Sequence, residues 1–292
     1  MSVSKFLFGE NTPLLSFDKF SQDYNLLVKN EFIMGKENLP ISLTTLSDIT
    51  IDQEKKESAI LNSIYLKSIT GNTDSEAMKP FLEQSLALSE ISPAIHIKRN
   101  LQGKIISIEQ KEKLTADWEL WKEKRLKSVF TEEKEQIRFI SNYTNGLKNF
   151  DQNFKRNLQY ILLLPEIYSV IFPPNKHFTF LYSHSQLNSR LVEGMEYQYQ
   201  MKLVKLDEEN DILSLELHAT LNNKEELNRR FLNKIYAAHP EFSLTDFGFT
   251  IEIKYVFQKS TSKIISAKLD FSEKLHDHLS YSICINMHEL NE

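Results

Sequence analysis

This sequence has little of several residues that common functional sites require. It contains a single cysteine, so no disulfide can form within the chain, which fits a reducing compartment. Its seven glycines argue against phosphate-binding loops and against the tight strand–helix turns of parallel α/β folds. No G-x-x-x-x-G-K-[ST], G-x-G-x-x-G or G-x-S-x-G segment occurs. The sequence therefore carries none of these nucleotide-binding or serine-hydrolase motifs.

An excess of basic residues is also missing. The chain has 35 Lys and Arg against 40 Asp and Glu, a formal net charge of −5, which argues against a nucleic-acid-binding protein. Hydrophobic residues make up 41% and charged residues 26%, as in an ordinary globular protein. Nineteen Phe and eleven Tyr supply enough apolar area for a substantial core.

No hydrophobic run is long enough to cross a membrane. The most apolar segment, Tyr160–Phe172, is too short to span a bilayer and contains Pro165 and Glu166. The N-terminal residues lack the apolar core and the cleavage site of a secretory signal. The sequence therefore predicts a cytoplasmic protein without a membrane span, and its frequent Lys, Asn and Ile suggest a bacterial source.

Alternation of apolar and polar residues predicts antiparallel strands over much of the chain. The pattern predicts hairpins at residues 41–69, 94–108 and 195–221, a helix at 224–238, and a meander at 249–287. Residues 1–40 show no pattern that assigns them. The predicted fold class is α+β, with a mainly antiparallel, curved sheet or pair of sheets.

Apolar residues recur at helical spacing in the middle of the chain. Leu114, Trp118 and Trp121 begin a series that continues past a break near Thr131 and ends at Pro165. This series predicts a long central helical region. The predicted organisation has three parts, either separate or fused in one composite domain: residues 1–112, 113–174 and 175–292.

The order hairpin, short helix, hairpin occurs twice and suggests an internal repeat. Ile95–Lys98 is similar to Ile251–Lys254, and Lys104–Ser107 is similar to Lys263–Ser266. A pair of hairpins cannot bury its apolar face alone. Two such units are therefore predicted to share one curved sheet across the helical region.

The strand order, with a helix-to-strand passage at Leu162–Pro165 and Pro173-Pro174, resembles that of the LolA/LolB-type lipoprotein carriers and related bacterial proteins. The resemblance rests on this pattern and not on a diagnostic motif. It implies a curved sheet with a helix across its concave side. It assigns no functional residue.

The most metal-like cluster is His276-Asp277-His278. Two histidines separated by one residue share one face of a strand, and His is a common zinc ligand. His288, on the last predicted strand, would supply a third ligand. The alternative interpretation is a polar loop between two strands. No cofactor is otherwise predicted.

Aromatic residues offer a candidate binding face. Trp118 and Trp121 lie on one face of a predicted helix, and Tyr197 and Tyr199 lie on one face of a predicted strand. Either pair would stack on a ligand or pack in the core, and core packing is the simpler interpretation for the tryptophans. Cys284 alternates with apolar neighbours, which favours a small buried residue over a thiolate nucleophile.

These observations favour a non-enzymatic binding protein. The first hypothesis is an adaptor, chaperone or immunity-type protein that contacts a protein partner or forms a homodimer through an exposed apolar patch. The second is a carrier of a hydrophobic small molecule, which requires a sizeable apolar pocket. The third is a metal-assisted hydrolase that uses His276 and His278.

Overall fold

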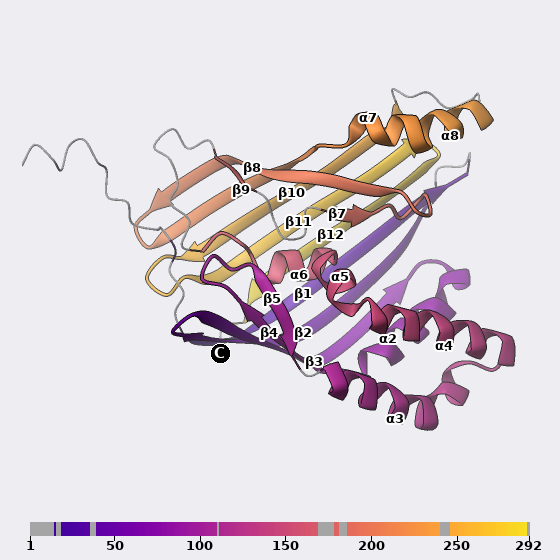
Figure 1. The fold of residues 1–292 in the computed structure, drawn as a ribbon, viewed down its shortest axis with the longest axis horizontal. Coiled ribbons are helices and arrows are strands. Elements are labelled where there is room, and N and C mark those ends of the chain that lie inside the picture. The colour runs from indigo at the N-terminus through magenta and orange to yellow at the C-terminus, as the bar shows by residue number, and fades with distance from the viewer. Residues whose placement is uncertain are drawn as a thin grey trace, which may run out of the picture.

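A computed structural model of the chain describes residues 15, 19–35, 39–109, 111–168, 178–180, 186–239 and 246–290. Its strands form one hydrogen-bonded path in the order β5-β4-β3-β2-β1-β12-β11-β10-β9-β8-β6, and β7 pairs with β8 (Figure 1). The strand pairs are antiparallel. The predicted α+β class with a large antiparallel sheet is confirmed.

The chain begins in the centre of the sheet and returns to it. β12 pairs with β1 from Tyr24 opposite Glu289 to Met34 opposite Leu279. The strands are β1 (Phe20–Met34), β2 (Pro40–Lys56), β3 (Ala59–Thr73), β4 (Ala94–Arg99), β5 (Ile105–Glu109), β6 (Phe178–Phe180), β7 (Gln186–Asn188), β8 (Glu196–Glu209), β9 (Ile212–Leu221), β10 (Gly248–Gln258), β11 (Lys263–His276) and β12 (Leu279–Glu289). Strands from both ends of the chain therefore share one sheet.

Alternation along each strand gives the sheet two different faces. In β8, Tyr197, Tyr199, Met201 and Leu203 are buried, while the residues between them are more exposed. Side chains at every second position point to the same face, so β8 presents an apolar side to the core, as do the other long strands. The predicted hairpins and meander are confirmed, and β1 lies within the N-terminal region that the sequence pattern did not assign.

The predicted long central helix is not confirmed, because the helical region is divided. The helical elements are η1 (Glu76–Met78), α2 (Lys79–Ser89), α3 (Lys111–Val129), α4 (Glu133–Lys148), α5 (Phe150–Lys155), α6 (Leu158–Leu163), α7 (Lys224–Leu227), the π-helix η2 (Asn228–Leu232) and α8 (Asn233–Ala238). Asn149 leaves helical geometry between α4 and α5. Asn157 has extended geometry and caps α6 by accepting a hydrogen bond from Gln159 N. The part of the chain that the structure describes contains no helix long and apolar enough to cross a membrane.

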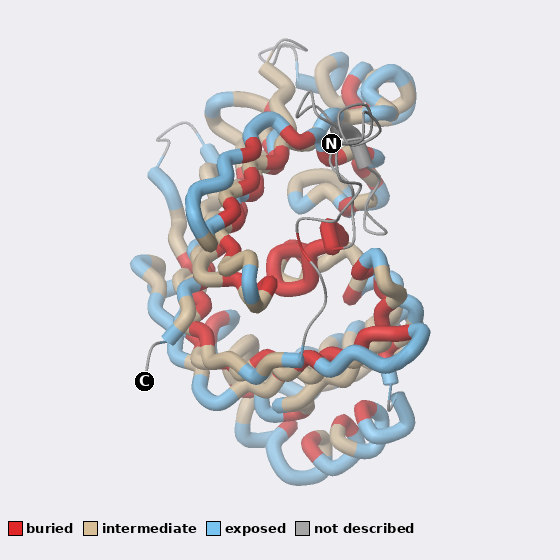
Figure 2. Tube along the Cα trace, turned by 90° about the vertical axis from the view of Figure 1, so that its left-hand side faces the viewer, coloured by how far each residue is buried: buried red, intermediate tan, exposed pale blue. Residues whose placement is uncertain are grey.

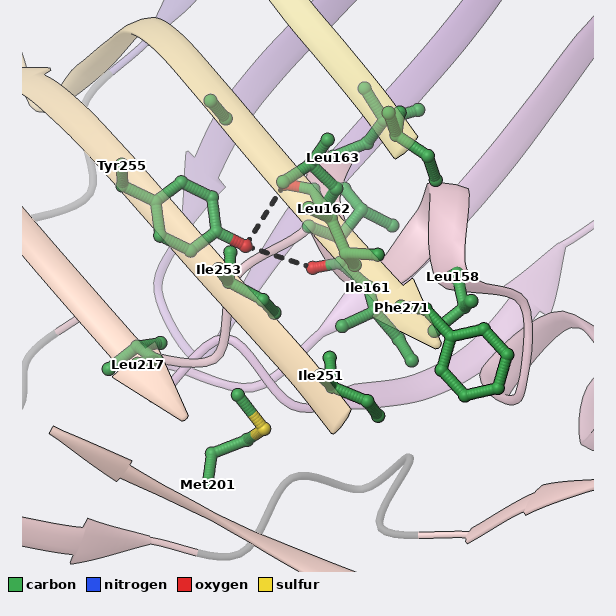
Figure 3. Packing of buried hydrophobic residues seen from close by; sticks show 14 of the residues in the cluster. Leu158, Ile161, Leu162, Leu163, Met201, Leu217, Ile251, Ile253, Tyr255 and Phe271 are labelled. Atoms are coloured by element: carbon green, nitrogen blue, oxygen red, sulfur yellow. Dashed lines mark hydrogen bonds between the residues drawn. The ribbon is translucent and has the colours of Figure 1, made fainter. Parts of the chain in front are cut away.

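α6 lies inside the curve of the sheet, and four of its six residues are buried (Figure 2). Leu158, Ile161 and Leu162 belong to the main hydrophobic core together with residues of β8 to β12. The Tyr255 hydroxyl donates to the carbonyl oxygens of Ile161 and Leu162 at 3.1 and 3.2 Å (Figure 3). It thereby satisfies backbone acceptors at the end of a helix that is too short to satisfy them itself.

A second, smaller core joins α2, α3 and α4. Trp118 is 1% and Trp121 is 5% exposed, and the two rings stack with their centroids 5.7 Å apart. Trp121 Nε1 donates to the carbonyl oxygen of Ala87, 3.1 Å away, which ties α3 to α2. Both tryptophans therefore build the helical layer beside the sheet.

The predicted internal repeat is not confirmed. The order hairpin, helix, hairpin does recur, with α2 between β3 and β4 and with α7 to α8 between β9 and β10. The strands that follow are unequal, since β4 and β5 have 6 and 5 residues whereas β10 and β11 have 11 and 14. Pro173-Pro174 of the helix-to-strand passage lies outside the described residues.

Candidate functional site

The three predicted metal ligands do not meet in one site. The rings of His276 and His278 lie 4.9 Å apart, and His276 Nδ1 accepts a hydrogen bond from the His278 backbone. His276 Nε2 lies 3.7 Å from a carboxylate oxygen of Asp246. His288 pairs with Ser266 at the other end of β12, roughly 30 Å away at ~3.3 Å per residue. The polar turn between two strands accounts for His276 and His278.

A different acid–histidine group forms on the outer face of β9 and β10. Ligand atoms of Glu216, His218 and Glu252 lie within 4.8 Å of one another, the sole such trio in the described ranges. Lys254 Nζ is 3.4 Å from Glu216, however, so a cation of the protein already neutralises this carboxylate. The side chains of His218 and Lys254 are 40% and 56% exposed. Sequence reasoning missed the group because the β9–β10 register brings Glu252 opposite His218.

The predicted aromatic binding face is buried. Tyr197 is 0% and Tyr199 is 1% exposed, in the main core, and the two tryptophans fill the smaller core. Burial is the main cause that raises the pKa of both tyrosines above the usual value of 10.0. All four rings are at most 5% exposed, so their main role is core packing.

Cys284 is expected to react slowly with alkylating agents. Burial raises the pKa of its thiol above 9.0, and the neighbouring Asp270 raises it further. A raised pKa leaves less thiolate at a given pH, and the thiolate is the nucleophile. At about pH 8, iodoacetamide should modify the folded chain more slowly than the urea-unfolded chain, and the difference should narrow above about pH 9. Equal modification rates of the folded and unfolded chain at about pH 8 would contradict the raised pKa of the thiol.

Two buried charged residues hold the core together. Arg99, 1% exposed, donates to the carbonyl oxygens of Gly103 and Pro165 and to Asn62 Oδ1. Glu273, 0% exposed, accepts hydrogen bonds from the Tyr197 hydroxyl, the Ser189 hydroxyl and the Arg190 backbone.

These partners are chiefly backbone and neutral groups that fix loops against the sheet. Buried charges of this kind need several hydrogen bonds. We therefore assign a structural role to Arg99 and Glu273.

A cavity of about 490 Å³ lies between the sheet, α2 and α6, and we call it the concave cavity. Strands β1 to β3 form its floor, and α2, the segment before β4, α4 and the α5–α6 junction supply its other walls. It is lined by Leu26, Thr45, Ser47, Ile49, Ile64, Leu66, Ile69, Ser85, Leu88, Ser89, Ser92, Pro93, Ile95, Tyr143, Asn157, Gln159, Tyr160 and Leu163. Its volume is in the range of small-molecule sites, roughly 300–1,000 Å³.

The lining of the concave cavity is uncharged. Aliphatic side chains dominate the floor, and hydroxyl and amide side chains lie among them. Ser92 Oγ is buried and has no hydrogen-bond partner among the described residues. The hydroxyl and amide side chains of the lining, among them those of Thr45, Ser85 and Gln159, are the groups that would bond to a neutral polar group of a ligand.

Sequence similarity gives no independent indication of what the cavity binds. A scan against protein-family models finds no match for this chain, and a search of curated proteins finds none either.

Proposed function

We propose that this protein is a non-enzymatic binding protein that holds an uncharged, largely apolar small molecule in the concave cavity. The observation that supports the proposal most is the uncharged lining over an aliphatic floor. Burying an apolar ligand there is favourable by roughly 25 cal/mol per Å² of apolar surface. A charged ligand would lose its hydration without gaining a counter-charge from the lining.

The same lining argues against catalysis in this cavity. Its described residues include no His, Cys, Asp, Glu, Lys or Arg. Its hydroxyl groups therefore have no neighbouring base in the lining that would activate them as nucleophiles. The metal-assisted alternative has lost its third predicted ligand, because His288 is remote from His276 and His278.

A protein partner is the second candidate. Large apolar side chains remain exposed on the helical layer, with Phe81 at 54%, Leu120 at 49% and Ile137 at 62%. Exposed apolar side chains on one layer offer contact area to a protein partner. An adaptor, chaperone or immunity-type role would use this layer. The resemblance to lipoprotein carriers and the cytoplasmic location stay predictions.

Filling the concave cavity should weaken ligand binding. Thr45 lines the cavity, so Thr45→Phe places a ring inside it. We expect dodecanol, an uncharged probe, to bind the natural protein and to bind Thr45→Phe at least about tenfold more weakly, a difference of ~1.4 kcal/mol. Isothermal titration calorimetry measures both affinities.

Thr44→Phe is the matched control. Thr44 precedes Thr45 on β2 and points to the opposite face of the sheet. It should retain the dodecanol affinity within about twofold. Equal binding by all three proteins would place the probe outside the cavity. No binding by any of them, together with a copurifying polypeptide, would favour the protein-partner candidate.

A further inference from the structure

A second uncharged hollow borders the concave cavity. It has a volume of about 420 Å³, and we call it the α4 groove. It is lined by Phe139, Asn142, Tyr143, Gly146, Leu147, Phe150 and Asn153. Tyr143 also lines the concave cavity, so one side chain forms a wall of both spaces. The two hollows are therefore neighbours on either side of this ring.

Gly146 keeps the α4 groove open. It lies inside the 16-residue helix α4, where glycine is less favourable than alanine by roughly 0.5–1 kcal/mol. A Cβ atom at this position would have no heavy atom within 4 Å, so packing within the chain does not require glycine here. The absent side chain leaves room beside Leu147 and Phe150.

Tyr143 is held at the boundary by other aromatic rings. Its centroid lies 4.2 Å from that of Trp118 and 6.1 Å from that of Phe139. Burial raises the pKa of Tyr143 to about 12, so its phenol is neutral at physiological pH. The boundary between the cavity and the groove is therefore aromatic and uncharged, like the lining on either side.

We infer that the ligand is a long-chain, uncharged amphiphile whose chain passes Tyr143 and continues from the concave cavity into the α4 groove. This inference rests on the proposed function. The cavity lining follows α2 from Ser85 to Ser89, roughly 6 Å, and the groove lining follows α4 from Phe139 to Leu147, roughly 12 Å. A short ligand would fill the first space alone.

The combination of the two linings favours an amphiphile over a pure hydrocarbon. Hydroxyl and amide side chains, among them those of Thr45, Ser85 and Gln159, lie in the cavity lining. They would bond to a terminal hydroxyl or another neutral polar group, whereas a carboxylate would find no cation in either lining. The inferred class is a long-chain alcohol or a molecule with a similar neutral head.

Two variants of α4 test the inference with probes of different length. Gly146→Leu fills the groove, and Asn145→Leu places the same side chain at the exposed neighbouring position. Hexanol and dodecanol are titrated into the natural protein and both variants, and the intrinsic fluorescence is recorded. The protein has two tryptophans, and Trp118 contacts Tyr143. An alkyl chain that passes Tyr143 should therefore change the tryptophan emission.

We expect Gly146→Leu to weaken dodecanol binding about tenfold and to change hexanol binding by less than about twofold. Asn145→Leu should leave both affinities unchanged. If Gly146→Leu binds dodecanol as tightly as the natural protein, the groove is not part of the site. The proposed function would then still stand, provided that Thr45→Phe loses the probe.

The charge of the head group is tested with dodecanoate. Weaker binding than that of dodecanol supports the uncharged class, and equal or tighter binding overturns it. If neither alcohol binds to any of the proteins, the proposed function fails and the inference fails with it. Thermal unfolding midpoints, which should agree among the unliganded variants within a few degrees, establish that each variant is folded.

Discussion

Replacing Gly103 with alanine is expected to lower the free energy of unfolding by about 3 kcal/mol. Gly103 has a φ of +90°, which costs a residue with a side chain roughly 1–2 kcal/mol. An added Cβ would also lie 2.7 Å from Arg99 Nη2 and 2.9 Å from the Pro165 carbonyl oxygen. The neighbours would have to move, which costs roughly 1–3 kcal/mol more. Urea unfolding followed by tryptophan fluorescence measures the loss.

Gly35→Ala separates the two causes. Gly35 has a similar φ of +97°, but an added Cβ there would have no heavy atom within 4 Å. This variant should lose only the conformational part, about 1 kcal/mol. Similar losses in the two variants would show that the contacts around Gly103 relax without cost. The excess loss at Gly103 therefore reports how rigidly the Arg99 and Pro165 contacts are held.

The alternation of the sequence predicted most of the strands, because burial on one face imposes a period of two. It did not assign β1, the strand that joins the two halves into one sheet. The same alternation contained a signal for the buried charges. Arg99 is in phase with Ile95 and Ile97 on β4, and Glu273 is in phase with Leu269 and Phe271 on β11. Composition rules assign such residues to the surface. Their phase along the strand placed them in the core.

The concave cavity was beyond the reach of sequence patterns. Its lining comes from segments between Leu26 and Leu163, and they meet through strand register and helix packing rather than through any local motif. Tyr143 was expected only as one apolar position in a helical series. Its place in the lining of both hollows follows from the packing of α4, where it contacts Trp118 on α3, and not from that series. Local pattern therefore predicted the elements but not the space between them.

Replacing Arg99 with methionine should cost about 3–5 kcal/mol, the range for removing one partner of a buried charged interaction. Methionine would fill much of the same volume but would leave three acceptors without their donor: Gly103 O, Asn62 Oδ1 and Pro165 O. Each buried acceptor left unsatisfied costs roughly 1–3 kcal/mol. Since Pro165 follows α6, we also expect faster hydrogen exchange in α6.

Arg125→Met is the matched control for Arg99→Met. Arg125 donates two hydrogen bonds to Glu90, but the two side chains are 46% and 49% exposed. Exposed pairs contribute roughly 0–1 kcal/mol, so the free energy of unfolding of this variant should lie within about 1 kcal/mol of that of the natural protein. Comparable losses in the two variants would contradict the structural role of the buried arginine.

The double variant Arg99→Met/Gly103→Ala tests whether the two residues act as one unit. Methionine removes the guanidinium that an alanine Cβ at Gly103 would approach to 2.7 Å. Gly103→Ala should therefore cost less in the Arg99→Met background than alone, by about 1 kcal/mol or more. Additive losses would mean that the strain at Gly103 comes from its φ and from Pro165. Losses that are clearly less than additive would instead show that the Arg99–Gly103 contact holds the β4–β5 turn against the segment after α6.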